Sequence, residues 1–339
     1  MKTQSDRGLQ VDVSIIVVNW NGCDLVRQCL TTVYGETKGI RFEVIVVDNQ
    51  SSDGSVDMLR SEFPQTKVIA SEVNLGFAAG NNVGMAAASG RYLLLLNPDT
   101  LLKGNAIAQM VTFADAHPKA GVLGPRVLNQ DGTLQLSCFM YPSLLNLVLS
   151  AFWLNKLFAR NRFFGREAMS WNTTTKERPV DVVSGCCMLV RREVYEQVGG
   201  MDESYFMYFE ETDWCYRAGR IGWEITYAPV AEIVHLGGAT TEAVKSDMMA
   251  QHAASLLLYF RKHKGLVAYR VACVLLALFF LLRMPYWLVS ALFSSRRAYA
   301  RTRLGICARI FLGAICGGGS LHFRRKSPDR SQEAGVMSP

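Results

Sequence analysis

The most constraining feature of this sequence is a series of short, uniformly apolar segments separated by stretches with helical character. Val, Ile and Leu fill these segments without polar alternation, which is typical of strands buried on both faces and hence of parallel sheets. The pattern predicts an α/β fold in which an open, mostly parallel sheet carries helices on both faces. The expected strands cover 13–18, 42–48, 67–72, 91–96 and 120–128, and the expected helices cover 24–34, 51–63, 74–89 and 103–118.

Acidic residues follow two of these strands at the point where each strand ends. Asp48 closes FEVIVVD, and Asn97, Pro98 and Asp99 follow four consecutive leucines. In open parallel sheets, ligands bind beyond the carboxyl ends of the strands. Asp48 and Asp99 are therefore expected on one rim, where an acid can bind a nucleoside or hold a divalent cation. The structural alternative for Asp99 is a helix N-cap.

A second acidic cluster and one histidine lie later in the chain. The stretch FEETDW places Glu210, Glu211 and Asp213 among aromatic residues. A carboxylate in apolar surroundings has a raised pKa, which suits a general base. The alternative is a solvated acidic first turn of a helix. His235 ends an apolar segment beside two glycines, where its imidazole could coordinate a metal ion.

Several signatures of other protein classes are missing. The first strand is followed by VVNWNGCDL rather than by GxGxxG, which argues against a dinucleotide-binding fold. Nine cysteines without a CxxC pair argue against a disulfide framework or a zinc site and favour a reducing cytosol. The first residues lack the apolar core of a secretory signal, so none is expected.

Charge is distributed unevenly along the chain. Residues 259–339 carry 14 Lys and Arg against 2 acids, a net +12, whereas residues 1–258 carry 22 against 27, a net −5. The basic residues are interleaved with long aliphatic runs, which favours an anionic membrane surface over nucleic acid as partner. The run 271–282 would reach only about 18 Å as a helix, short of the ~30 Å hydrocarbon core. Helices lying in or re-entering the interface are therefore expected, with one span within 266–293 and a buried helical cap as alternatives.

Six segments, taken in order, resemble the family 2 glycosyltransferases, and most closely the rhamnosyltransferase-like branch that builds bacterial cell-surface polysaccharides. The resemblance covers about residues 12–265. It implies a GT-A-type fold, an inverting transfer of a sugar from a nucleotide-sugar, and Mg²⁺ or Mn²⁺ as cofactor. It also suggests dTDP-L-rhamnose as donor and a polyprenyl-diphosphate-linked saccharide as acceptor. The segments are SIIVVNWN, VVDNQSSDGS, NLGFAAGNN, LLLLNPDT, SGCCMLVRREVYEQVGGMDESYFMYFEETDWCYR and VHLGG.

The resemblance also implies roles for individual residues. Asp99 and His235 stand where the family has its metal ligands, and Glu211 is expected to be the catalytic base. Two positions depart from the family pattern: Asn97 stands where many relatives have an acid, and Glu211 where many have Asp. The expected catalytic group comprises Glu211, Glu210 and Asp213, and the expected donor-binding group comprises Asn19, Asp48, Asn49, Ser51, Asp53, Asn81 and Asn97.

The predicted organisation has four parts. A disordered N-terminus (1–11) precedes the GT-A-type domain (12–265), which is followed by a membrane-associating helical region (266–322) and a disordered basic tail (323–339). Residues 143–164 predict a helix that faces an acceptor cleft or the membrane. The expected location is the cytoplasmic face of the plasma membrane.

Three other functions compete with this one. A nucleotidyltransferase would usually show a phosphate loop rich in Gly, Arg and Lys near the first strand. A processive polysaccharide synthase would carry several long membrane helices and a QxxRW-type motif. A non-catalytic membrane scaffold would not need acids at successive strand ends.

Overall fold

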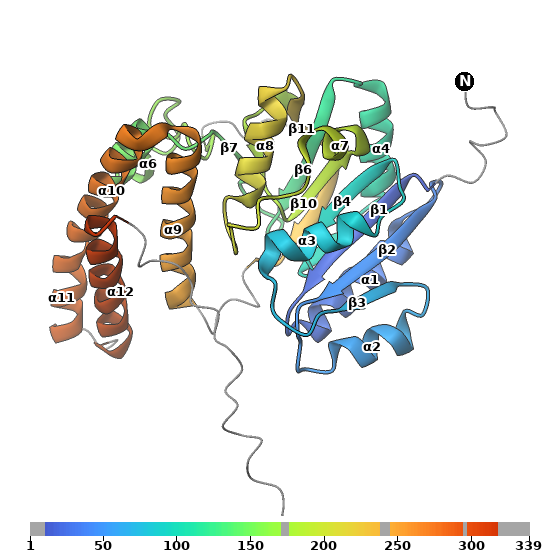
Figure 1. Cartoon of the computed structure of the whole chain (residues 1–339), viewed down its shortest axis with the longest axis horizontal. Helices are drawn as coiled ribbons and strands as arrows, with labels where there is room; N and C mark the ends of the chain where they lie inside the picture. The colour runs from blue at the N-terminus through green and yellow to red at the C-terminus, as the bar shows by residue number, and fades with distance from the viewer. Residues whose placement is uncertain (1–10, 171–175, 238–244, 294–296, 318–339) are drawn as a thin grey trace, which may run out of the picture.

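The structure, a computed structural model, describes residues 11–170, 176–237, 245–293 and 297–317. A mixed sheet with helices on both faces forms one part of the molecule, and a group of helices forms the other (Figure 1). Almost all of the predicted disordered N-terminus, and all of the predicted tail 323–339, lie outside the described residues.

The centre of the sheet is parallel, as the apolar segments predict. β1 is buried along its whole length and lies between β2 and β4 with parallel pairing on both sides, and β3 extends the sheet beyond β2. Equal burial of both faces explains why these strands lack polar alternation. The bounds are β1 (Val13–Asn19), β2 (Phe42–Asp48), β3 (Lys67–Ala70) and β4 (Tyr92–Leu96).

The other half of the sheet is mixed. β10 lies antiparallel between β4 and β6, so β6 and its parallel neighbour β11 run in the same direction as β1. A short strand that the sequence pattern does not predict, β5, pairs antiparallel with β11 and places Thr100 opposite His235. The bounds are β5 (Thr100–Leu102), β6 (Ala120–Leu128), β8 (Arg178–Pro179), β10 (Cys187–Arg191) and β11 (Glu224–His235). β8 pairs with β11 at the side of the sheet. β7 (Cys138–Phe139) and β9 (Val182–Val183) pair with each other in a separate two-stranded sheet.

Helices cover both faces of the sheet. One core cluster joins α1, α2 and α4 to one face, and a second joins α3, α7 and α8 to the other. Small residues let α3 approach closely: a Cβ at Gly84 would lie 2.4 Å from the Ile16 side chain. The bounds are α1 (Cys23–Glu36), α2 (Ser55–Glu62), α3 (Gly76–Ala86), α4 (Ala106–Ala116), α7 (Arg192–Val198) and α8 (Glu210–Arg220).

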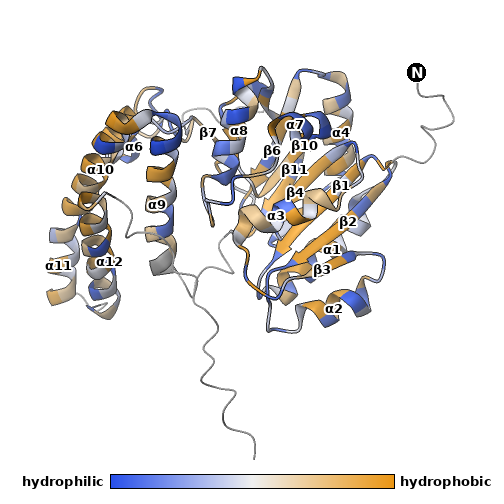
Figure 2. Cartoon of the chain, in the orientation of Figure 1, coloured by the Kyte–Doolittle hydropathy of each residue, from blue (hydrophilic) through white to orange (hydrophobic). Residues whose placement is uncertain are grey.

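The remaining helices form a separate apolar cluster beside the sheet (Figure 1). α10 packs against α5, α9 and α12, and α11 packs against α12. Figure 2 shows long hydrophobic stretches on α10 and α11. In the described part of the chain one stretch, Gly265–Phe293, is long and apolar enough to cross a membrane. The bounds are α5 (Leu144–Ala151), α6 (Leu154–Leu157), α9 (Lys245–His263), α10 (Gly265–Leu281), α11 (Met284–Phe293) and α12 (Arg297–Ile315).

The prediction of a single helix over 143–164 is wrong. α5 ends at Ala151, and the short α6 begins at Leu154 after Trp153 takes a left-handed backbone conformation with φ 57°. Because left-handed geometry interrupts the helical hydrogen-bond ladder, α5 does not continue into α6. The Trp153 ring instead packs under the guanidinium of Arg283, 4.0 Å from the ring centroid.

Candidate active site

A cavity of about 370 Å³ opens at the carboxyl ends of the parallel strands. This is where the parallel-strand rule places ligand sites. Asp99, Glu211 and His235 all line it, as do Asn49 and Asn97. The other lining residues are Val18, Trp20, Asn74, Gly76, Phe77, Pro98, Ser184, Gly185, Cys186, Phe206, Met207, Tyr208, Glu210 and Met248.

Strand pairing brings Asp99 and His235 together. β5 begins one residue after Asp99, and its pairing with β11 sets Thr100 opposite His235. The backbone amide of Leu236 donates to the carbonyl oxygen of Asp99 at 2.9 Å, which fixes this edge. As a result, His235 Nε2 lies 3.2 Å from Asp99 Oδ1. Both side chains are largely buried.

The orientation of the His235 ring is set by Gln135. Gln135 Oε1 lies 2.7 Å from His235 Nδ1, while its Nε2 donates to Asn129 Oδ1 at 2.8 Å. The amide oxygen can only accept, so Nδ1 carries a hydrogen. In the neutral ring Nε2 then presents its lone pair toward Asp99, with the Asn97 amide 3.3 Å away.

This pair fits a divalent cation. A carboxylate oxygen and an imidazole lone pair 3.2 Å apart repel each other unless a proton or a cation lies between them. Two neighbouring ligands of an octahedral site at about 2.1 Å from the metal are about 3.0 Å apart. Among the described residues no group of three His, Cys, Asp or Glu gathers. Asp99 and His235 would supply two ligands of such a cation.

Glu210 and Glu211 begin α8 at the edge of the cavity. The two residues before them, Tyr208 and Phe209, both have positive φ, at 69° and 68°. This left-handed pair turns the chain so that the first turn of α8 lies on the cavity. Non-glycine residues in this region carry strain that the surrounding structure must offset.

Burial changes the acidity of both glutamates. The pKa of Glu210 is raised well above its ordinary value by burial and then by the neighbouring Glu211 charge. Burial raises the pKa of Glu211 to about 7. Glu210 Oε2 has no hydrogen-bond partner among the described residues. Burial therefore favours the neutral form of the pair, and Glu211 is able to accept a proton near neutral pH.

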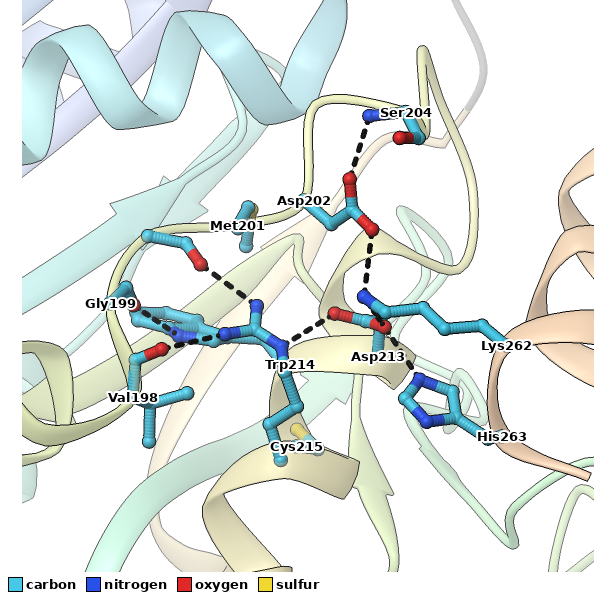
Figure 3. A network of polar contacts seen from close by, with 12 residues as sticks. Val198, Gly199, Met201, Asp202, Ser204, Asp213, Trp214, Cys215, Lys262 and His263 are labelled. Atoms are coloured by element: carbon cyan, nitrogen blue, oxygen red, sulfur yellow. Dashed lines mark hydrogen bonds and ion pairs between the residues drawn. The ribbon is translucent and has the colours of Figure 1, made fainter.

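Asp213 belongs to a different environment from the two glutamates, although the same turn of α8 carries it. It is fully buried and does not line the cavity. Its carboxylate receives the side chains of Lys262 and His263 (Figure 3) and that of Arg217, at 2.6, 2.6 and 2.7 Å. A carboxylate with three such partners is not available to substrate.

The expected donor-binding residues divide into two groups. Asn49 and Asn97 line the cavity, whereas the other five do not. Asp48 accepts from Asn19 Nδ2 at 3.1 Å and from the Ser51 amide at 2.9 Å. These contacts hold the end of β2 against the end of β1.

Asp53 and Asn81 make local structural contacts. Asp53 accepts from the amides of Cys23 and Ser55, at the starts of α1 and α2, at 2.8 and 3.1 Å. Asn81 donates to the Phe77 carbonyl within α3 at 2.9 Å. Their predicted donor contacts stay predictions.

Some cavity residues were not predicted from the sequence. Trp20 is 36% exposed just after β1, and an aromatic residue at a strand end was a usable signal. Met248 comes from α9, which shows that the helical part contributes to the cavity. Gln135, which orients His235 without lining the cavity, carried no signal, because its contact with His235 spans 100 residues.

The chain belongs to glycosyl transferase family 2, whose model matches residues 14–199. The family and the GT-A-type fold that the sequence motifs implied are confirmed.

Two relatives show which members of the family this chain resembles. The chain is 32% identical over 245 residues to N-acetylglucosaminyl-diphospho-decaprenol L-rhamnosyltransferase of Mycobacterium tuberculosis, covering 66% of this chain and 76% of that protein. It is 24% identical over 262 residues to the rhamnosyltransferase WbbL of Escherichia coli, covering 74% and 94%. Rhamnosyltransferase-like members of the family are thus among its relatives.

A solved structure shares the fold. The mannosyltransferase PcManGT of Pyrobaculum calidifontis, in complex with GDP-Man and Mn²⁺, has a TM-score of 0.52 and 18% identity. The match covers 90% of this chain and 88% of that one. At this identity the likeness concerns the fold alone.

Proposed function

We propose that this glycosyltransferase moves a sugar from a nucleotide-sugar to a lipid-linked saccharide, with inversion at the anomeric carbon. One observation carries the proposal: Glu211 lines the same cavity as the Asp99–His235 pair. Such a reaction needs a base for the acceptor hydroxyl and a site for a diphosphate with its cation. The cavity offers candidates for both.

Glu211 is the proposed base. Its carboxylate takes the proton of the acceptor hydroxyl as that oxygen bonds to the anomeric carbon. The bond from this carbon to the diphosphate oxygen breaks, and the nucleoside diphosphate leaves with the electron pair. Attack opposite the leaving group inverts the configuration. Protonated Glu210 keeps the pair from carrying two negative charges.

Asp99 and His235 are the proposed ligands of Mg²⁺ or Mn²⁺. When bound, the cation supplies Lewis-acid neutralisation of the diphosphate. Gln135 keeps the Nε2 atom of His235 available by accepting from Nδ1. Asn97, which replaces an acid of many relatives, leaves the site with one carboxylate and a neutral amide. Mg²⁺ is commonly held by one or two carboxylates together with substrate phosphates.

The relatives support particular substrates. Similarity to an enzyme named as acting on a diphospho-decaprenol substrate supports a polyprenyl-diphosphate-linked acceptor. Two relatives named as rhamnosyltransferases support L-rhamnose, supplied as dTDP-L-rhamnose.

Features of the helical region support the proposal that the protein acts at a membrane. We assign residues 12–265 to catalysis and 266–322 to association with the anionic cytoplasmic face of the plasma membrane, in a peripheral or re-entrant manner. Arg283 divides the apolar stretch, and its guanidinium donates to the Ser150 carbonyl of α5 at 3.0 Å. This contact fixes the link between α10 and α11 against α5. Exposed apolar side chains there include Leu266, Val267, Val274, Leu288, Val289, Leu292 and Phe293.

The test is a screen of nucleotide-sugars for metal-dependent thermal stabilisation, followed by assay of nucleoside diphosphate release. Stabilisation scales with ligand occupancy of the folded state. We expect dTDP-L-rhamnose with Mg²⁺ or Mn²⁺ to stabilise the protein, and a polyprenyl-diphosphate saccharide to trigger release. Glu211→Gln should abolish release and leave donor stabilisation intact. Full turnover in this variant would reject Glu211 as the base.

The same assay separates the remaining alternatives. A nucleotidyltransferase would release pyrophosphate from a nucleoside triphosphate, and a scaffold would release neither product. Pyrophosphate release, or no product with any donor and acceptor, would reject the glycosyl transfer.

A further inference from the structure

The buried carboxylate of Asp213 is the centre of a polar cluster that the proposed chemistry does not use. Lys262 and His263, at the end of α9, donate to Asp213 Oδ1, each at 2.6 Å (Figure 3). Arg217 donates to Asp213 Oδ2 at 2.7 Å and to the carbonyls of Val198 and Gly200, both at 2.8 Å. The cluster therefore joins three separate segments: α8, the end of α9 and the loop that follows α7.

A second carboxylate balances the charge of this cluster. Lys262 Nζ also contacts Asp202 Oδ2 at 2.7 Å, and Asp202 accepts from the Ser204 amide at 2.9 Å (Figure 3). Two lysine or arginine side chains thus face two aspartates. Since Asp213 is fully buried, removal of one cation would leave its charge poorly compensated.

The cluster lies one helical turn from the glutamates of the cavity. Residues three apart on a helix share a face, so Asp213 follows Glu210 along α8. A carboxylate held from three sides fixes the helix that carries Glu211. Simple stabilisation of the fold is the competing explanation, and it makes different predictions for catalysis.

An independent set of contacts shows α9 holding the start of α8. Ser255 Oγ of α9 donates to the Met207 carbonyl at 2.9 Å. The His252 ring packs against the rings of Tyr208 and Phe209, with centroids 5.4 and 4.9 Å apart. Tyr208 and Phe209 are the two left-handed residues that lead into Glu210. α9 therefore contacts both the strained entry to α8 and its first turn.

We propose that Lys262 and His263 are positioning residues, which set the location of Glu211 through the Asp213 carboxylate. Because this role presupposes the glycosyl transfer proposed above, the test needs one readout that does not depend on turnover. The chain leaves α9 for the apolar α10 just after His263, at Gly265. The cluster thus also lies at the junction between the catalytic part and the helical region.

The main experiment compares Lys262→Met with Lys264→Met in the full-length protein. Both substitutions remove one lysine charge, but Lys264 is exposed and its ammonium faces the Tyr216 ring at 5.3 Å rather than Asp213. We expect Lys262→Met to lower kcat roughly 10- to 100-fold, as for a misplaced catalytic group. The KM for the donor should stay within about threefold, and Lys262→Arg should recover most of kcat. Lys264→Met should leave kcat within about threefold of the wild type.

Two further measurements test whether Lys262 acts through Asp213 and whether it orders the start of α8. In the Asp213→Asn background, Lys262→Met should cause no additional loss of kcat, because residues acting through one partner are not additive. Amide hydrogen exchange over residues 206–214 should increase in Lys262→Met and not in Lys264→Met.

Specific outcomes would overturn the inference. Equal kcat and equal exchange in the two lysine variants would do so. So would a kcat loss accompanied by an equal loss of donor binding and a fall in Tm, which indicates simple destabilisation. Additive losses in the double variant would reject the route through Asp213. Absence of turnover in the wild type would reject the proposed function instead, and the exchange comparison would still decide whether Lys262 orders the start of α8.

Discussion

At the end of β2, Asp48 accepts hydrogen bonds from Asn19 and from the Ser51 amide, whereas at the end of β4, Asp99 faces His235. Both aspartates are nearly fully buried and both follow parallel apolar strands. Asp48 accepts hydrogen bonds from residues beside it, whereas Asp99 faces the lone pair of His235 Nε2 at the cavity. Position at a strand end therefore does not decide function; the partners that other strands bring do.

The largest expected effect is that of Asp99→Asn. Loss of the only carboxylate of the proposed metal pair should weaken metal-dependent donor binding by more than about 100-fold, beyond the loss usual for an indirect partner. Thermal stabilisation by the nucleotide-sugar at increasing Mn²⁺ measures this. The matched control is Asp48→Asn, the same substitution at the other strand end. Equal losses in the two variants would show that Asp48 and Asp99 do not differ in their role in donor binding.

A smaller effect is expected from Gln135→Leu. This variant removes the acceptor that orients His235 Nδ1, and loss of such a partner typically weakens metal binding about 10- to 100-fold. Gln135→Glu retains an acceptor and should bind metal nearly as the wild type does. Titration of Mn²⁺ in the presence of donor reports both values. Unchanged binding in Gln135→Leu would show that the ring is held by other contacts.

The pH dependence of turnover tests the pair that begins α8. Burial raises the pKa of Glu211 to about 7, and the base acts only when ionised. As pH falls through 7, kcat/KM should therefore decline about tenfold per pH unit. A profile over pH 5–9 with saturating metal measures this. A profile that stays flat down to pH 5, as the ordinary value of about 4.3 for glutamate would give, would contradict a buried base.

The smallest effect on binding is expected for Asp48→Asn. The amide replaces one of two accepting oxygens, so the free energy of unfolding should fall by about 1–2 kcal/mol. Donor binding should weaken less than tenfold, because Asp48 does not line the cavity. Urea unfolding and the donor thermal shift give the two quantities. If donor binding weakens far more than stability falls, the result would favour a direct contact of Asp48 with the nucleoside, as the family resemblance implies.

Much of the sheet could be predicted, because its central strands are uninterrupted apolar runs. β1, β2, β4 and β6 are buried on both faces, so their apolar runs stand out from the helices between them. β5 has only three residues, too few for a pattern. The antiparallel insertion of β10 between β4 and β6 depends on which strands meet in space, which local composition does not record.

The candidate site was predictable in part. Motif resemblance pointed to Asp99, His235 and Glu211, and the structure brings all three to one cavity. The acidic cluster in FEETDW also suggested Asp213, whose carboxylate the structure instead pairs with Arg217, Lys262 and His263. Glu211 and Asp213 lie within one turn of the same acidic stretch, so only their long-range neighbours distinguish them.

By itself the sequence determined where the buried strands lie and which polar residues follow them, because burial on both faces requires uninterrupted apolar runs. Tertiary structure alone decided which of these polar groups meet. The pairing of β5 with β11 sets His235 against Asp99, and the packing of α9 on α8 occupies Asp213 while leaving Glu211 at the cavity. Hydrogen-bond and charge satisfaction depends on groups far apart in the chain, so these outcomes follow from packing and register.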